Sequence, residues 1–139
     1  KIESANAASK IRALIKNCGE RLDAPFDGEE SITLYADLEA GISGSMSSAL
    51  LPEKIAPVID YFWNNEKDKA EEVYNSILPL INFENRQCGF RATKTVMKEG
   101  GVIKSDFCRD PIKPLDLDTK NLLLNYAKRY DLLSYNWGK

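Results

Sequence analysis

The stretch LEAGISGSMSSALLPE, residues 38–53, contains the last change between strand and helix that the sequence predicts. Gly41 stands where a helix usually ends in a glycine cap. The next segment, ISGSM at residues 42–46, predicts a short strand whose small side chains allow close approach by another group. Pro52 suits the first turn of a new helix. Because the sequence after this stretch predicts only helices and loops, it marks the end of the β-containing part of the chain.

The segments before this stretch alternate between strand and helix. Residues 1–3, KIE, predict the end of a strand, and residues 6–18 predict a helix with apolar residues spaced by three and four. Residues 21–28 predict a second strand, and residues 29–41 predict a second helix. The order β-α-β-α-β is typical of a parallel sheet covered by helices. Three short strands cannot close a barrel, so we predict that the chain is the second part of a larger α/β fold.

The remainder of the chain predicts helices separated by turns. Three of these helices are expected at residues 52–65, 66–86 and 87–101. Pro79 is expected to kink the second of them, and Gly100 and Gly101 are expected to close the third. A proline-rich loop follows at residues 106–116. Asp118 is the expected N-cap of the last helix, whose buried face is predicted to contain Leu122, Leu123, Tyr126 and Tyr130.

The composition narrows the function. The 139 residues are 43% hydrophobic and 29% charged, which is typical of a globular domain. A net charge of −2 without a basic block argues against nucleic-acid binding, and the apolar runs are too short to span a membrane. Histidine is absent, so acid–base chemistry must fall to carboxylates, lysine, tyrosine or hydroxyls. The spacing of Cys18, Cys88 and Cys108 fits no metal site or disulfide framework and favours reduced thiols in a cytoplasmic protein.

Five segments in order resemble the C-terminal half of the dihydrodipicolinate synthase and N-acetylneuraminate lyase family. They are KIE, AASKIRALI, FDGEES, LEAGISGSMSSALLPE and RATKTVMKEGGVIKSDFCRDPIKPLD. The versions KIE and GISGSM are most similar to the sugar-acid dehydratase branch. The resemblance implies an α/β fold in which residues 1–64 are strands six to eight of a (β/α)8 TIM barrel with their helices. Residues 65–139 would be a C-terminal helical extension, and the N-terminal half of the barrel would lie outside this chain.

The resemblance also implies a class I lyase. Family enzymes form a Schiff base between a lysine at the end of strand six and pyruvate or another 2-oxo acid. They need no metal or dissociable cofactor and are usually homotetramers, so the implied partners are a small 2-oxo acid and further copies of the chain. Lys1 matches the family lysine, although its position alone also fits a solvated terminal residue. Because an attacking amine must be neutral, we expect burial to lower the pKa of Lys1.

Further candidate substrate contacts follow from the same resemblance. Gly28 matches a glycine whose carbonyl faces the substrate, and it also fits an ordinary turn. Glu30 matches a position that contacts substrate hydroxyls, and it also fits a first-turn glutamate stabilised by the helix dipole. Strand alternation sends Ser43 and Ser45, on either side of Gly44, to one side. We interpret that side as the barrel interior, where two hydroxyls suit a polyhydroxylated substrate, although small residues also suit packing in a narrow barrel.

Three functions stay open from the sequence. The first is a Schiff-base lyase that cleaves or dehydrates a 2-keto-3-deoxy sugar acid. The second is dihydrodipicolinate synthase, which condenses pyruvate with aspartate semialdehyde. The third is a non-catalytic barrel relative that binds a 2-oxo acid or serves as an assembly subunit. A nucleotide-binding domain ranks last, because ISGSM lacks the glycine spacing of a phosphate-binding loop.

Overall fold

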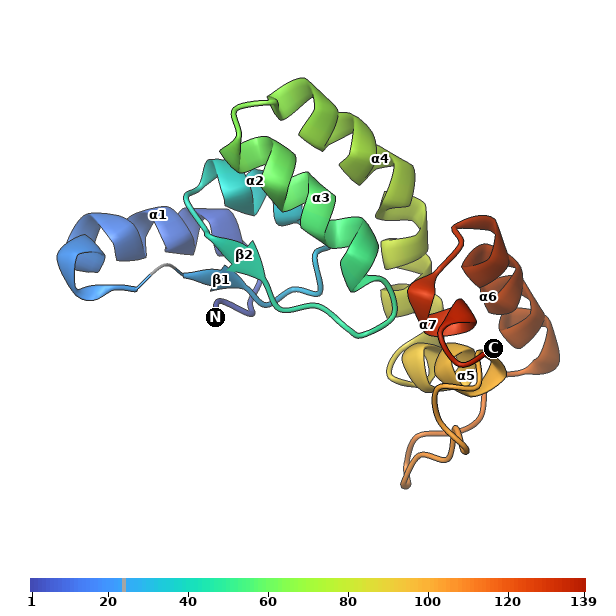
Figure 1. Ribbon diagram of the computed structural model, residues 1–139. Coiled ribbons are helices and arrows are strands. Elements are labelled where there is room, and N and C mark those ends of the chain that lie inside the picture. Colours follow the sequence, from blue (N-terminus) through green and yellow to red (C-terminus); the bar gives the residue numbers. More distant parts are fainter. Residues whose placement is uncertain (24) are drawn as a thin grey trace. The chain divides into compact units, whose positions relative to one another are not determined.

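The structure, a computed structural model, describes residues 1–23 and 25–139, which form two compact units (Figure 1). The first unit comprises residues 1–47 and 54–78, and the second comprises residues 48–53 and 79–139. Each unit has buried apolar side chains of its own. No helix in the described part of the chain combines the length and apolarity needed to cross a membrane.

A small parallel sheet organises the first unit. Strand β1 (Phe26–Asp27) pairs in parallel with β2 (Gly44–Ser45), and Ile2 forms a parallel bridge with Asp27 on the other side of β1. The three segments therefore run in the predicted parallel direction. The strands are much shorter than predicted, and residue 21, the predicted start of the second strand, lies in a 3-10 turn, η1 (Gly19–Arg21). Residue 24, within the strand predicted at residues 21–28, lies outside the described residues.

Helices α1 (Ala7–Cys18) and α2 (Leu34–Glu39) follow the first two strand segments. The predicted glycine cap of α2 is confirmed, because Gly41 has a φ of 102° and its N–H donates to the carbonyl of Leu38 at 3.0 Å. The predicted start at residue 29 is wrong, since residues 29–33 form turns before Leu34. The first unit is completed by most of α3 (Pro52–Trp63), which begins at the predicted proline, and by the first part of α4 (Lys67–Phe83).

The second unit is helical. The end of α4 continues into a π-helical turn, η2 (Glu84–Cys88), and is followed by α5 (Arg91–Glu99), α6 (Leu117–Arg129) and α7 (Leu133–Asn136). Helix α5 packs against α6 and α7. The predicted N-cap of α6 is wrong: the side chain of Asp116, not Asp118, accepts the N–H of Thr119 at 2.9 Å. The predicted buried face is confirmed at Leu123, which lies in the core together with Ala127, and is wrong at Leu122, which is 45% exposed.

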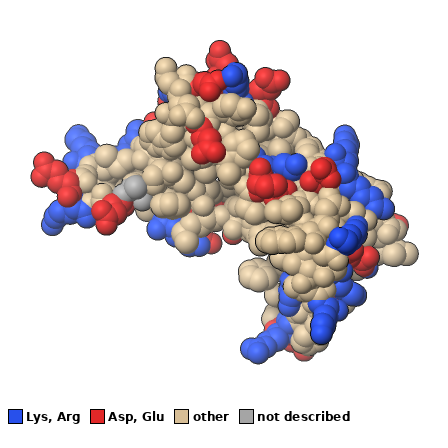
Figure 2. Space-filling view, viewed as in Figure 1, with Lys and Arg blue, Asp and Glu red and all other residues tan. Residues whose placement is uncertain are grey.

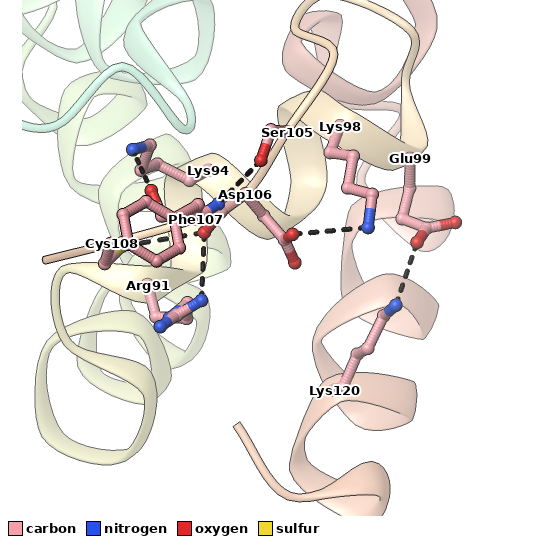
Figure 3. A network of polar contacts seen from close by, with 9 residues as sticks. All are labelled: Arg91, Lys94, Lys98, Glu99, Ser105, Asp106, Phe107, Cys108 and Lys120. Atoms are coloured by element: carbon pink, nitrogen blue, oxygen red, sulfur yellow. Dashed lines mark hydrogen bonds and ion pairs between the residues drawn. The ribbon is translucent and has the colours of Figure 1, made fainter. Parts of the chain in front are cut away.

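The segment between α5 and α6 contains no regular element, as predicted, and α5 holds it in place. Arg91, Lys94 and Lys98 lie on one face of α5, because their spacing is three and four residues. Figure 3 shows these side chains reaching toward residues 106–107. Arg91 is buried and donates to the carbonyls of Asp106 and Ile112, both at 2.9 Å. Lys and Arg also gather on the surface of this segment, at the lower edge of Figure 2.

Candidate active site

The two faces of the small sheet carry different groups. Ile2, Asp27 and Ser45 are in register, so their side chains share one face. Lys1 precedes Ile2 and therefore lies on the other face, which we call the lysine face. Two backbone bonds fix this register: the N–H of Ile2 donates to the carbonyl of Phe26 at 2.9 Å, and the N–H of Gly28 donates to that of Ile2 at 2.8 Å.

Gly28 borders Lys1 on the lysine face. A Cβ atom at Gly28 would lie 3.0 Å from Lys1 Cδ, from Glu3 Cβ and from the carbonyl oxygen of Ile2. Such distances are shorter than ordinary van der Waals contact. Glycine is therefore required at this position if the lysine side chain is to pass over the end of β1.

Lys1 is ion-paired and half exposed. Its Nζ atom lies 2.7 Å from Oε2 of Glu3, and the two side chains are 41% and 59% exposed. The hydrogen bond and the charge of Glu3 raise the pKa of Lys1, and the charges of Glu30 and Asp27 add to this effect. Burial lowers the pKa of Lys1, but this effect is smaller than that of Glu3. The pKa of Lys1 is therefore raised in this chain, and the lowering expected from burial at the mouth of a complete barrel stays a prediction.

Asp27 organises the turn behind the lysine face. It is fully buried; its Oδ1 accepts the N–H of Glu29 at 2.7 Å, and its Oδ2 accepts the N–H of Ser31 at 3.0 Å. Glu30 and Ser31 consequently adopt left-handed backbone conformations, with φ of 55° and 67°. Glu30 thus lies in a turn and not in the first turn of a helix. Aspartate often captures N–H groups two residues on, so the letters D-G-E-E-S contained a signal for this turn that the helix prediction missed.

Ser45 takes part in the same network on the face opposite Lys1. Its hydroxyl donates to Oδ2 of Asp27 at 2.7 Å and also lies 2.7 Å from the hydroxyl of Ser31. Because the proton of Ser45 is used by Asp27, Ser31 must be the donor in the second bond. The structure thus places Ser45 on the face opposite Lys1, and the orientation of Ser43 and Ser45 toward the barrel interior stays a prediction. By alternation both lie opposite Lys1, and the hydroxyl of Ser43 donates to the carbonyl of Pro25 at 3.3 Å.

Gly44, between the two serines, lies on the lysine face beside Phe26. A Cβ atom at Gly44 would lie 2.6 Å from Cε1 of the Phe26 ring, so the absence of a side chain makes room for the ring. Phe26 is 40% exposed and was not singled out by the sequence reasoning. Alternation along β1 was the available signal, because Phe26 and Gly28 must share a face. The lysine face therefore combines an amine, two glycines and an aromatic ring.

Tyr74 contacts the turn that follows β1. Tyr74 donates its hydroxyl to the carbonyl of Ile32 at 2.5 Å, and burial, followed by the charges of Asp27 and Asp37, raises its pKa to about 12. Tyr74 is therefore a neutral hydrogen-bond donor at physiological pH. Within the described ranges, no group of three or more cysteine or acidic side chains is placed to hold a metal ion.

Comparison with known proteins identifies the family. A model of the dihydrodipicolinate synthetase family matches residues 3–129. The chain belongs to this family. It is 44% identical over 138 residues to an L-2-keto-3-deoxyarabonate dehydratase from Azospirillum brasilense, a match that covers 99% of this chain and 45% of the relative. It is 26% identical over 132 residues to a 4-hydroxy-tetrahydrodipicolinate synthase from Geotalea daltonii, covering 94% and 43% of the two sequences.

The fold agrees with this membership. The crystal structure of dihydrodipicolinate synthase from Rhodopseudomonas palustris matches 93% of this chain and 44% of that protein, with a TM-score of 0.81 and 25% identity. The chain therefore folds like part of a dihydrodipicolinate synthase-type (β/α)8 barrel protein. The chain spans less than half the length of the family relatives that it matches.

Proposed function

We propose that the full-length protein is a Schiff-base lyase that dehydrates a 2-keto-3-deoxy sugar acid, with Lys1 as the nucleophile. One observation carries the proposal: Lys1 and Gly28 share the lysine face of a strand end, in a chain that is 44% identical to a 2-keto-3-deoxy sugar-acid dehydratase. In the proposed arrangement, residues 1–3, 25–28 and 42–46 are strands six, seven and eight of the barrel. Active sites of such barrels lie at the C-terminal ends of the strands.

In the proposed chemistry, the iminium ion formed from the lysine acts as an electron sink. The neutral amine of Lys1 attacks the 2-oxo group of the substrate, and the adduct loses water to give an iminium ion. The positive charge acidifies the neighbouring C3–H bond, whose proton leaves to form an enamine. The enamine then expels the hydroxyl from C4 as water after protonation, and hydrolysis of the remaining iminium frees Lys1. These steps require a base, an acid and an iminium, and they require no metal or dissociable cofactor.

The remaining candidate residues receive supporting roles. We assign Gly28 and Gly44 to close approach of the 2-oxo acid to the backbone, and Glu30 to the substrate hydroxyls. Both glycines border the lysine face, and the charge of Glu30 acts on Lys1. Ser43 and Ser45 lie opposite Lys1 and are assigned to support rather than to substrate contact. By family resemblance we further propose a homotetramer in the cytoplasm.

A trapping experiment tests the proposal. The full-length protein is incubated with pyruvate and borohydride, and the modified peptide is mapped by mass spectrometry. The expected result is a reduced pyruvyl adduct on the Lys1 side chain, together with turnover of a 2-keto-3-deoxy sugar acid. An adduct on a different lysine, or no adduct on folded protein, contradicts the proposal and favours a non-catalytic barrel relative.

A second candidate function is favoured by the relatives named 4-hydroxy-tetrahydrodipicolinate synthase, at 26% identity in the Geotalea daltonii protein. Such an enzyme would form the same adduct on Lys1 but condense the enamine of pyruvate with aspartate semialdehyde. Turnover with the semialdehyde and none with sugar acids would select this function.

A further inference from the structure

The turn that follows β1 is held by one buried carboxylate. Asp27 is 0% exposed, and it accepts the N–H of Glu29 at 2.7 Å on Oδ1 and the N–H of Ser31 at 3.0 Å on Oδ2. Its Oδ2 also accepts the hydroxyl of Ser45 at 2.7 Å. Both oxygens of the carboxylate therefore have donors. Two of the three donors are backbone groups on either side of Glu30, so one side chain fixes the backbone around that residue.

The backbone of this turn has a conformation that its residues do not favour by themselves. Glu30 and Ser31 have φ of 55° and 67°, in the left-handed region that residues with a side chain rarely adopt. Tyr74 holds carbonyl groups of the same turn, because its hydroxyl lies 3.3 Å from the oxygen of Ser31 and 2.5 Å from that of Ile32. Such conformations persist only where surrounding contacts determine them. The conformation at Glu30 is thus set by Asp27 and Tyr74.

The same turn brings a carboxylate near the candidate site. Glu30 follows two residues after Gly28, which borders Lys1 on the lysine face, and the charge of Glu30 raises the pKa of Lys1. Because φ sets the direction of a side chain relative to its neighbours, relaxation of the turn would point Glu30 elsewhere. The carboxylate proposed above for the substrate hydroxyls therefore stays near Lys1 only while the turn is held.

We propose that Asp27 is a positioning residue that sets the substrate preference of the enzyme through Glu30; the inference rests on the proposed function. Pyruvate has no hydroxyl, so it makes no hydroxyl contact with Glu30. A 2-keto-3-deoxy sugar acid has hydroxyls from C4 onward, and it gains this contact only when Glu30 is held in place. Loss of the turn therefore weakens the reaction of the sugar acid and leaves adduct formation with pyruvate nearly unchanged.

The substitution Asp27→Asn releases the turn and keeps the shape of the side chain. Each oxygen of Asp27 accepts one N–H of the turn, so the new NH2 group faces an N–H donor in either orientation of the amide. One of the two bonds that hold the turn is therefore lost. Among the carboxylates that act on Lys1 through charge, Asp27 has the smallest effect, behind Glu3 and Glu30. The amine itself is thus little changed by the substitution.

Asp37→Asn is the matched control. Asp37 is also 0% exposed and lies in the same unit, but its Oδ2 accepts the hydroxyl of Thr33 at 2.7 Å, outside residues 29–31. Both substitutions remove a buried negative charge, and only Asp27→Asn removes a bond to the turn. A merely structural role of Asp27 would lower the reactions of both substrates equally, whereas a role through Glu30 separates the two substrates.

The experiment compares two substrates in the full-length protein. Turnover of 2-keto-3-deoxyarabonate gives kcat/KM, and pyruvate with cyanoborohydride gives the rate of adduct formation on Lys1 by mass spectrometry. For Asp27→Asn we expect kcat/KM to fall about tenfold or more, which corresponds to one lost hydrogen bond to a charged group, and the pyruvate rate to change less than about threefold. Both values should stay within about twofold of wild type in Asp37→Asn. Asp27→Asn combined with Glu30→Ala should lose no more than Glu30→Ala alone, because both remove the same contact.

Each outcome decides a different question. If wild type forms no adduct on Lys1 or does not convert the sugar acid, the proposed function fails, and this inference fails with it. If wild type does both, equal effects of Asp27→Asn on the two substrates, no effect, or additive losses in the double variant overturn only the positioning role. Should Asp27→Asn fail to fold, Tyr74→Phe and hydrogen exchange in wild type replace it. Slow exchange of the Glu29 and Ser31 amides with a fall confined to the sugar acid supports the proposal, and unprotected amides or equal rates overturn it.

Discussion

Replacing Arg91 should release the segment between α5 and α6. The guanidinium is buried and donates to the carbonyls of Asp106 and Ile112, both at 2.9 Å (Figure 3 draws the first). Because these carbonyls are six residues apart in sequence, one side chain fixes the segment at two points. Arg91→Met keeps the helix and most of the buried volume but removes both donors.

The expected change in the free energy of local opening follows from the two hydrogen bonds and from the cost of burying the guanidinium charge. A hydrogen bond to a charged group contributes about 1.5–3 kcal/mol, so the pair contributes about 3–6 kcal/mol. Part of this is offset by desolvation, since Nε of Arg91 is buried and meets no acceptor among the described residues. The freed carbonyls also regain water at the surface. We expect a net loss of about 2 kcal/mol in the local opening free energy, which is about a 30-fold faster opening.

Hydrogen–deuterium exchange of peptides covering residues 103–115 measures this opening. The informative amides are those of Phe107 and Ile112, which donate to Ser105 Oγ and to the carbonyl of Arg109, both at 3.1 Å. Lys94→Met is the control, because its exposed amine binds the same segment and should change exchange by less than about threefold. Unchanged exchange in Arg91→Met, with α6 peptides also unchanged, would refute the reasoning.

Four further outcomes are expected. Gly100→Ala should cost about 2–3 kcal/mol in chemical denaturation, because the new Cβ would lie 2.4 Å from the carbonyl oxygen of Ser134. Asp116→Ala should lower the melting temperature by a few degrees, because α6 loses its N-cap. Burial raises the pKa of Asp37, so its ionisation costs stability as pH rises above about 3.9; Asp37→Asn should therefore unfold at higher denaturant than wild type at pH 7, with no advantage near pH 3. Burial and the charge of Glu84 raise the pKa of Cys88 to about 11, so iodoacetamide at pH 8 should leave it unlabelled in the folded protein.

Each of these four predictions has a control or a result that would contradict it. Gly19→Ala is the control for Gly100, because its added Cβ would meet only Cγ2 of Ile15, at 4.0 Å, and equal losses at both sites would reject the steric argument. Asp118→Ala should leave α6 unchanged, and a larger loss there than at Asp116 would restore the cap predicted from the sequence. The more exposed Cys18 should be labelled first. A stability of Asp37→Asn below that of wild type at pH 7 would show that the buried carboxylate is better satisfied than its unpartnered Oδ1 indicates.

Periodicity and cap residues predicted most of the helices, because these signals are local. The glycine caps after α2 and α5, the proline at the start of α3 and the parallel direction of the strand segments all follow from neighbouring residues. The errors at the helix starts occur where an aspartate side chain captures nearby backbone N–H groups. The prediction of a helix from residue 29 ignored a buried carboxylate that captures the N–H groups of Glu29 and Ser31 first. Likewise, Asp116 and Asp118 are equivalent as sequence signals, and the path of the chain into α6 selects between them.

At the candidate site, the orientation of Ser43 and Ser45 depends on contacts between separate segments of the chain. Alternation correctly placed Ser43 and Ser45 on one side, but it does not specify which side. That choice depends on the register with β1, and the register depends on pairing between segments about 18 residues apart. A buried acceptor on one face, Asp27, and a ring over Gly44 on the other settle it. The network of Asp27, Ser31 and Ser45 is therefore a support for β2 and the turn that carries Glu30.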